Sequence, residues 1–254
     1  MIKGEIEMRA FLKYTWIEIK LFMREPVGAF FTLLFPLLML FLFGAIYGNE
    51  PSPLFNGYGT IDISLPAYTA MIIATTGIIG LSITMSAYRE KGILRRLRVS
   101  PLRPAVILAG QVVVIFLMTV LGMLLLILAG TLVYDLRFDG NVLDVVLAFL
   151  LGSLSFFSLG FVLASVMPNA RTAQVVSMAI IYPMLFLSGA GMPLEILPES
   201  IRSFSKFLPL THVVTLLRGL WTGGSWAEHT TEIWVLLTLM VLGIVVSSRT
   251  FRWE

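Results

Sequence analysis

Six long apolar runs constrain the fold of this chain more than any other feature. The runs are Val27–Tyr47, Pro66–Ala87, Pro104–Tyr134, Val145–Met167, Thr172–Gly191 and Ile233–Ser248. None of them contains Asp, Glu, Lys or Arg, and only 13% of the whole chain is charged. Because a helix rises about 1.5 Å per residue, about 20 apolar residues cross a bilayer core. We therefore predict an all-α integral membrane protein whose residues 1–254 form one domain with six transmembrane helices.

The distribution of basic residues predicts the orientation of these helices. If the N-terminus is cytoplasmic, all but four of the 18 Lys and Arg residues lie on the inner side, as the positive-inside rule requires. The four on the outer side are Arg137, Arg202, Lys206 and Arg218. Both termini are then inside, which requires an even number of spans.

Residues 5–25, before the first run, are predicted to form an amphipathic helix lying on the membrane. Its apolar face includes Leu12, Trp16, Ile19 and Phe22, and its basic edge carries Arg9, Lys13, Lys20 and Arg24. Such a helix buries its apolar side chains while its bases meet anionic lipid. The pattern leaves two readings open: a membrane anchor alone, or an anchor that also contacts a cytoplasmic partner.

Residues 88–103 form a basic cytoplasmic loop with an apolar ridge. Ile93, Leu94 and Leu97 recur at helical spacing among Arg95, Arg96 and Arg98, and Ser100-Pro101 ends the piece. A loop that only fixed the topology would need the bases but not the ridge. The ridge favours contact with a partner, while orientation alone remains the alternative.

Residues 192–231 are predicted to form two short helices on the outer side. Pro193, Pro198 and Pro209 divide the segment, and each piece is too short to span a bilayer. The sequence supports two interpretations of this segment equally. The pieces are re-entrant helices that close a pathway, or they form an interfacial belt anchored by Trp221 and Trp226.

Mildly polar side chains mark two of the runs. Tyr68, Thr75, Ser82 and Ser86 share a stripe on the second run, and Gln174, Ser177 and Tyr182 lie on the fifth. Such stripes can line a translocation pathway, but they are more often packing faces between helices, which is the reading we favour.

Several chemistries are missing from the sequence. It has no cysteine, only two histidines, and no acidic residue within the runs. It also lacks the G-x-x-x-x-G-K-[ST] phosphate loop and the common hydrolase motifs. We expect no catalytic residues, no bound metal or cofactor, and no nucleic-acid partner. A protein of this kind that moves a solute uphill must take its energy from another polypeptide.

With these features, the sequence resembles the membrane subunit, or permease, of an ABC-2-type ATP-binding-cassette exporter of the drug-resistance branch. The resemblance spans nearly the whole chain. The loop YREKGILRRLRVSPL matches the family pattern at Glu90, Gly92, Arg95, Leu97, Ser100 and Pro101. The segment before the last run matches it at Ser188, Gly189, Pro193, Pro198, Pro209, Thr211 and Arg218.

The resemblance implies an architecture and partners that composition alone does not indicate. Two copies of the chain would pair with two separate ATPase subunits, which would bind ATP and Mg²⁺. Residues 88–103 would be the coupling helix that docks on the ATPase, with the N-terminal helix beside it. The outer segment would be re-entrant and would close the pathway. The expected location is the cell membrane of a prokaryote, with both termini in the cytoplasm.

These patterns fit four functions to different degrees. The leading one is export of an amphipathic drug-like or lipid-like substrate. A second is export of a polysaccharide or teichoic-acid-type glycolipid, since such exporters share the plan. A non-transporting membrane scaffold explains the spans but not the apolar ridge. An intramembrane enzyme lacks any candidate catalytic pair.

Overall fold

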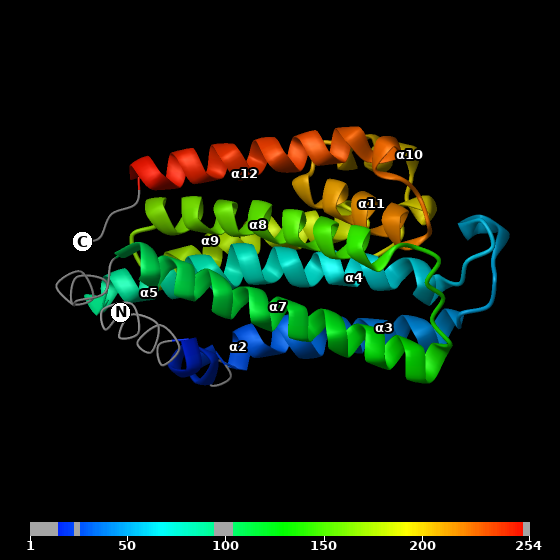
Figure 1. Cartoon of the computed structure of the whole chain (residues 1–254), viewed down its shortest axis with the longest axis horizontal. Helices are drawn as coiled ribbons and strands as arrows, with labels where there is room; N and C mark the ends of the chain where they lie inside the picture. The colour runs from blue at the N-terminus through cyan, green and yellow to red at the C-terminus, as the bar shows by residue number, and fades with distance from the viewer. Residues whose placement is uncertain (1–14, 23–25, 94–103, 251–254) are drawn as a thin grey trace, which may run out of the picture.

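The computed structural model of this chain describes residues 15–22, 26–93 and 104–250, and it is a bundle of helices (Figure 1). Six helices are long and apolar enough to cross a membrane, which confirms the predicted fold class. Their bounds are Phe30–Tyr47, Thr60–Glu90, Leu108–Tyr134, Val142–Val166, Ala170–Leu187 and Trp226–Thr250. The third span belongs to a 31-residue helix, α7, whose length of about 46 Å exceeds the bilayer core.

The spans are built from the following elements. The first comprises α2 (Pro26–Ala29), the π-helical η1 (Phe30–Leu34) and α3 (Phe35–Tyr47), and the second comprises α4 (Thr60–Ala74), the π-helical η3 (Thr75–Leu81) and α5 (Ser82–Glu90). The others are α7 (Pro104–Tyr134), α8 (Val142–Val166), α9 (Ala170–Leu187) and α12 (Thr230–Thr250). Short elements are η2 (Pro53–Phe55), η4 (Leu194–Ile196), α10 (Glu199–Ser205), α11 (Pro209–Trp221) and η5 (Trp226–His229).

The helices of the bundle run between two ends (Figure 1). One carries the last turn of α5, the connection from α8 to α9 and the end of α12, and we call it the α5 end. The other carries the connections at residues 48–59, 135–141 and 188–229, and we call it the loop end. Residues 15–22 are helical and lie near α2 at the α5 end.

The second span is the central helix of the bundle. Nearly every side chain of α4 and η3 is buried, because α3, α7, α8, α9 and α11 all pack against this span. A helix that is apolar on all sides suits such a position. Glycine allows the closest approach: a Cβ added at Gly160 of α8 would lie 2.0 Å from the carbonyl oxygen of Gly77 in η3. Small residues at this crossing therefore bring the two backbones together.

Two helix boundaries differ from the sequence prediction by four residues or more, and the others differ by less. The second span starts at Thr60 rather than Pro66, because the Asp62 carboxylate accepts the Gly59 amide hydrogen and caps the helix. The fifth ends at Leu187 rather than Gly191, because the chain turns at Gly189, where φ is +89°. A left-handed residue at this position ends a helix, and glycine adopts it without strain.

The two short helices predicted between the fifth and sixth spans are α10 and α11. Pro209 begins α11 at its first helical position, where a missing amide hydrogen costs nothing. Val213 of α11 packs against Gly152, near the middle of α8, while Trp221 at the other end of α11 reaches the loop end. The chain therefore dips into the bundle before α11 and returns to the loop end along α11 (Figure 1).

Candidate functional site at the two ends of the bundle

Three consecutive side chains at the end of α5 connect this helix to other elements. The Tyr88 hydroxyl donates a hydrogen bond to Glu18 of the N-terminal helix. The Arg89 guanidinium donates to the carbonyl of Met167, which follows α8. Glu90 accepts the amide hydrogen of Ala170, the first residue of α9, at 3.0 Å. The base of the predicted coupling loop is thus tied to three other helices.

Glu90 occupies a favourable electrostatic position. The first amide groups of a helix have no partner within it, and the helix dipole favours a negative charge there. Glu90 supplies that charge to α9, and Asn169 accepts the Thr172 amide hydrogen at the same helix start. The sequence pattern singled out Glu90, but its partner is 80 residues away and could not be read from the loop.

The remaining residues of the predicted coupling set divide into two groups. Gly92 has φ +65° and carries the turn that ends α5, which explains why the motif has glycine there. Ile93 is partly buried at the last described position of this segment. Leu94, Arg95, Leu97, Ser100 and Pro101 lie outside the described residues, so their coupling role stays a prediction.

Part of the predicted N-terminal helix lies within the described residues. Over residues 15–22, Thr15 and Glu18 are buried, while Trp16 is 59% exposed. The Lys20 ammonium lies 5.2 Å from the centroid of the Trp16 ring, a cation–π distance. Ile19 and Phe22 are partly buried. Arg9, Leu12, Lys13 and Arg24 lie outside the described residues, and the membrane role of the helix stays a prediction.

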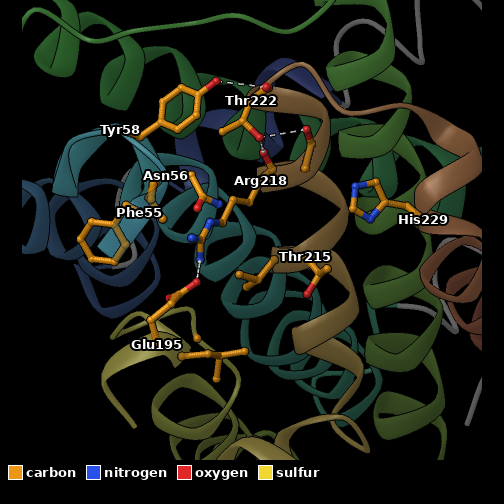
Figure 2. Close-up of a pocket in the computed structure, with 13 residues that line it drawn as sticks. Phe55, Asn56, Tyr58, Glu195, Thr215, Arg218, Thr222 and His229 are labelled. Carbon is orange, nitrogen blue, oxygen red and sulfur yellow. Dashed lines mark hydrogen bonds and ion pairs between the residues drawn. The ribbon is translucent and has the colours of Figure 1, made fainter. Parts of the chain in front are cut away.

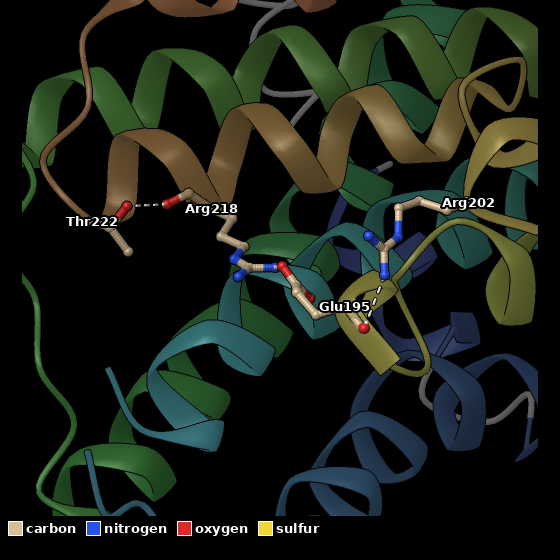
Figure 3. A network of polar contacts seen from close by, with 4 residues as sticks. All are labelled: Glu195, Arg202, Arg218 and Thr222. Carbon is tan, nitrogen blue, oxygen red and sulfur yellow. Dashed lines mark hydrogen bonds and ion pairs between the residues drawn. The ribbon is translucent and has the colours of Figure 1, made fainter. Parts of the chain in front are cut away.

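A cavity of about 300 Å³ lies at the loop end (Figure 2). Arg218 of α11 and Glu195 of η4 face each other there at 2.6 Å, and both side chains are partly exposed. The Arg202 guanidinium also donates to the carbonyl oxygen of Glu195 at 2.9 Å, which fixes the backbone of η4 (Figure 3). The predicted motif arginine therefore pairs with a glutamate that the sequence reading did not single out.

Tyr58 and Thr222 border the same cavity (Figure 2). The Tyr58 hydroxyl donates to Asp139 at 2.9 Å and to the Thr222 carbonyl at 3.1 Å. Partial burial and the hydrogen bond to Asp139 raise the pKa of Tyr58 above its ordinary value of 10.0. The contact joins three loop-end connections that are far apart in the sequence.

Asp62 is a functional candidate that sequence reasoning missed. Its carboxylate is completely buried and accepts three hydrogen bonds at 2.9 Å, from the Asn49 side chain and the amides of Gly59 and Arg137. A buried carboxylate needs such donors to remain in the protein interior. The only sequence signal was its position just ahead of an apolar run.

The predicted residues of the outer segment sit at its turns and helix starts. Ser188 is buried and caps α9, and its hydroxyl oxygen accepts the Ala190 amide hydrogen. Pro193 and Pro198 precede η4 and α10. The Thr211 hydroxyl donates to the carbonyl of Ser205 at 2.7 Å and so closes the turn between α10 and α11. These residues shape the segment.

The polar stripes of the second and fifth spans meet inside the bundle. The hydroxyl oxygens of Ser82 and Ser177 lie 2.8 Å apart, and both residues are fully buried. Thr75 donates to the carbonyl of Met71, and Ser86 is buried with no hydrogen-bond partner in the described chain. This arrangement favours helix packing for these four residues.

The other residues of the stripes are buried to different degrees. Tyr68 is buried in α4, while Tyr182 of α9 is partly buried and lies edge-on to Phe31, with ring centroids 6.2 Å apart. Gln174 lines a small hollow of about 120 Å³ near Phe22 and Thr84. A pathway role stays a prediction for the whole set. No group of three or more Asp, Glu or His within the described ranges could hold a metal ion.

The fold and these sites define a polytopic membrane protein with a polar anchor at one end and a charged cavity at the other. Residues 9–221 match the family model described as ABC-2 type transporter, and the chain belongs to that family.

Three relatives illustrate the breadth of the family. The chain is 27% identical over 223 residues to the daunorubicin resistance ABC transporter permease protein DrrB1 of Streptomyces coeruleorubidus, covering 85% of this chain and 77% of that one. It is 35% identical over 99 residues to nodulation protein J of Rhizobium leguminosarum bv. viciae, covering 39% and 38%. It is 23% identical over 188 residues to the probable multidrug ABC transporter permease YbhS of Escherichia coli K12, covering 74% and 48%. The last two matches thus span less than half of those relatives.

Proposed function

We propose that this chain is the transmembrane subunit of an ATP-driven exporter that moves an amphipathic drug-like or lipid-like substrate out of the cell. Membership of the ABC-2 family and the names of the relatives DrrB1 and YbhS, which describe drug-resistance and multidrug permeases, support this proposal. Two copies of the chain would pair with two copies of a separate ATPase, and both termini would be cytoplasmic. The α5 end would then face the ATPase.

The contacts of Glu90 and Arg89 support a coupling role for the α5 end most directly. A loop that moved with the ATPase would pull on α5, and α5 is joined to the start of α9 and the end of α8 by these two side chains. Movement would therefore reach two membrane helices together. A hydrogen-bonded contact between α5 and α9 would transmit movement directly, whereas a loop without such contacts would not.

The experiment is reconstitution of the chain with its ATPase in proteoliposomes. Leu94→Asp with Leu97→Asp should abolish complex formation and substrate-stimulated ATP hydrolysis, because a charge replaces the apolar ridge. Leu94→Ile with Leu97→Met, which keeps the ridge apolar, is the matched control and should retain both. Unchanged hydrolysis and assembly in the Asp variant would reject the coupling role.

A glycolipid exporter is the alternative within transport, and a scaffold is the alternative outside it. Among the aromatic residues that could line a glycan path, Phe156 and Phe157 are buried within the helix packing, while Phe186 is 65% exposed. Stimulation of ATP hydrolysis by amphipathic drugs rather than by lipid-linked sugars would distinguish the two exporters. A scaffold would form the complex without transporting either class.

A further inference from the structure

The loop-end cavity is lined mainly by three segments that are far apart in the sequence (Figure 2). Residues 55–58 contribute one wall, residues 189–195 a second, and one face of α11 the third. Val214, Arg218 and Thr222 recur at every fourth position along that face. Its volume of about 300 Å³ is at the lower limit of the usual range for small-molecule sites. The cavity therefore has room for one compact group rather than for a whole amphiphile.

The two charged side chains in the cavity wall neutralise each other. Among the described residues that line the cavity, Glu195 and Arg218 are the only Asp, Glu, Lys or Arg, and they pair at 2.6 Å. A cationic ligand would have to compete with Arg218 for the carboxylate, and an anionic ligand with Glu195 for the guanidinium. Because separating an ion pair leaves each charge without its partner, the cavity favours a ligand without net charge.

Other polar groups in the wall are available to a ligand. In the described part of the chain, Glu195 is the only partner of the Arg218 guanidinium, which leaves further N–H donors. The Asn56 amide and the Thr215 hydroxyl line the cavity and have no hydrogen-bond partner among the described residues. Each of these two groups can both donate and accept a hydrogen bond, as the hydroxyl groups of a sugar or another polyol do.

The turn that carries Asn56 is held in place by its own hydrogen bonds. The Gly57 amide donates to the carbonyl of Ser52 at 3.0 Å, and the Tyr58 amide donates to the carbonyl of Phe55 at 3.1 Å. Phe55 and Tyr58 also add aromatic surface to the cavity, against which the C–H groups of a ring can pack. A wall that is already ordered loses less conformational entropy when a ligand binds.

We propose that the loop-end cavity binds a neutral polyhydroxylated group, such as one sugar unit. Its hydroxyl groups would exchange hydrogen bonds with Arg218, Asn56 and Thr215, and its C–H groups would pack against Phe55 and Tyr58. Two sources supply this chemistry: the head group of an exported amphiphile, and a free sugar. The link to export rests on the proposed function, whereas the binding site itself does not.

The test uses the full chain in phosphatidylcholine nanodiscs with a photoreactive probe, a glucoside that carries an aryl diazirine. After illumination, mass spectrometry should place the label on peptides that contain residues 53–58, 189–195 or 214–222. Octyl glucoside should compete with the probe, whereas octyl phosphate and octylammonium at the same concentration should not. Methyl glucoside distinguishes the two sources. Competition equal to that of octyl glucoside indicates a free sugar, and much weaker competition indicates an amphiphile.

Two variants of Thr215 test the hydrogen bonding. Thr215→Val removes the hydroxyl, keeps the shape of the side chain, and should lower labelling about fivefold, the size of one lost hydrogen bond. Thr215→Ser keeps a hydroxyl and should retain the labelling. Thr131→Val, at an exposed position of α7 that does not line the cavity, is the matched control and should leave the labelling unchanged.

Glu195→Gln tests the balance of charge in the wall. It leaves Arg218 without its carboxylate partner, so the cavity gains a net positive charge. Octyl phosphate should then compete with the probe about tenfold better than it does in the native chain, because it can bond to the unpaired guanidinium. Glu199→Gln, at an exposed position outside the cavity wall, is the control and should not change the competition.

Three results would overturn the proposal. They are competition by octyl phosphate or octylammonium as strong as that by octyl glucoside in the native chain, label outside the three segments, and native labelling of Thr215→Val. None of them bears on whether the ATPase drives transport. Conversely, loss of coupling in the proteoliposome experiment would leave the labelling result intact.

Discussion

At the scale of single residues, Asp62 connects the loop end more extensively than any residue that the sequence motifs single out. Its three donors come from residues 49, 59 and 137, so one carboxylate joins the connection after α3, the start of α4 and the connection after α7. A buried donor left without an acceptor costs about 1–3 kcal/mol, which makes this carboxylate important for stability.

We predict that Asp62→Ala destabilises the protein, because it removes the acceptor of three hydrogen bonds, of which the one from Gly59 is buried and the other two are partly buried. The melting temperature of the purified chain in detergent, followed by circular dichroism or intrinsic fluorescence, should fall by several degrees. Asp135→Asn is the control, since Asp135 is exposed and asparagine tolerates its positive φ. Equal melting of both variants with the native chain would contradict the role of Asp62.

Tyr58 gives a prediction about alkaline pH. Its pKa is higher in the folded protein than in the unfolded chain, so the neutral hydroxyl stabilises the fold below pH 10. That contribution should disappear as the pH rises through the folded-state pKa. Tyr58→Phe should therefore melt lower than the native chain at neutral pH, and the difference should shrink above pH 10. A constant difference across this range would argue against the Asp139 contact as its source.

At the scale of elements, the crossing of α8 and η3 depends on glycine. Gly160→Ala would place a Cβ 2.0 Å from the Gly77 carbonyl oxygen, so the helices must separate. Overpacking of this kind typically costs about 1–3 kcal/mol.

Gly80→Ala is the matched control for this crossing, because a Cβ there meets nothing within 4 Å and alanine favours the helix. We expect Gly160→Ala to lower the melting temperature and Gly80→Ala to leave it unchanged or raise it.

The contact between α5 and α9 leads to a prediction about coupling. Glu90→Ala removes a charge at the start of α9 that contributes about 0.3–1 kcal/mol, so the fold should remain intact. Transport per ATP hydrolysed should nevertheless fall several-fold in proteoliposomes, because α5 would no longer move α9 directly. Lys91→Gln, at the adjacent exposed position, should keep the native ratio. A native ratio in Glu90→Ala would exclude this contact as the route.

At the scale of the whole molecule, orientation can be tested cleanly because the chain has no cysteine. Glu50→Cys places a single thiol at the loop end, and Lys91→Cys places one at the α5 end, both at exposed positions. A membrane-impermeant maleimide added to intact cells should label Glu50→Cys only. Lys91→Cys should react after permeabilisation. The reverse pattern would invert the orientation and remove the docking face for a cytoplasmic ATPase.

The amino-acid sequence by itself determined the number of spans, their approximate limits and the two short helices before α12. These features follow from local properties: apolar length against bilayer thickness, and prolines that cannot continue a helix. The loop motif also identified Glu90 and Gly92, and the outer-segment motif identified Arg218, although neither motif indicated what these residues contact. Local patterns suffice for features of this kind because each is set within a few turns of chain.

Only the tertiary structure decided which residues meet. Asp62 with Arg137, Glu90 with Ala170, and Glu195 with Arg218 are separated by many residues, and nothing in either local sequence names the partner. Each transmembrane helix satisfies its own backbone hydrogen bonds and needs only its own apolar residues to lie in the bilayer. Hydrogen bonds and ion pairs between helices depend instead on how those helices are arranged around one another.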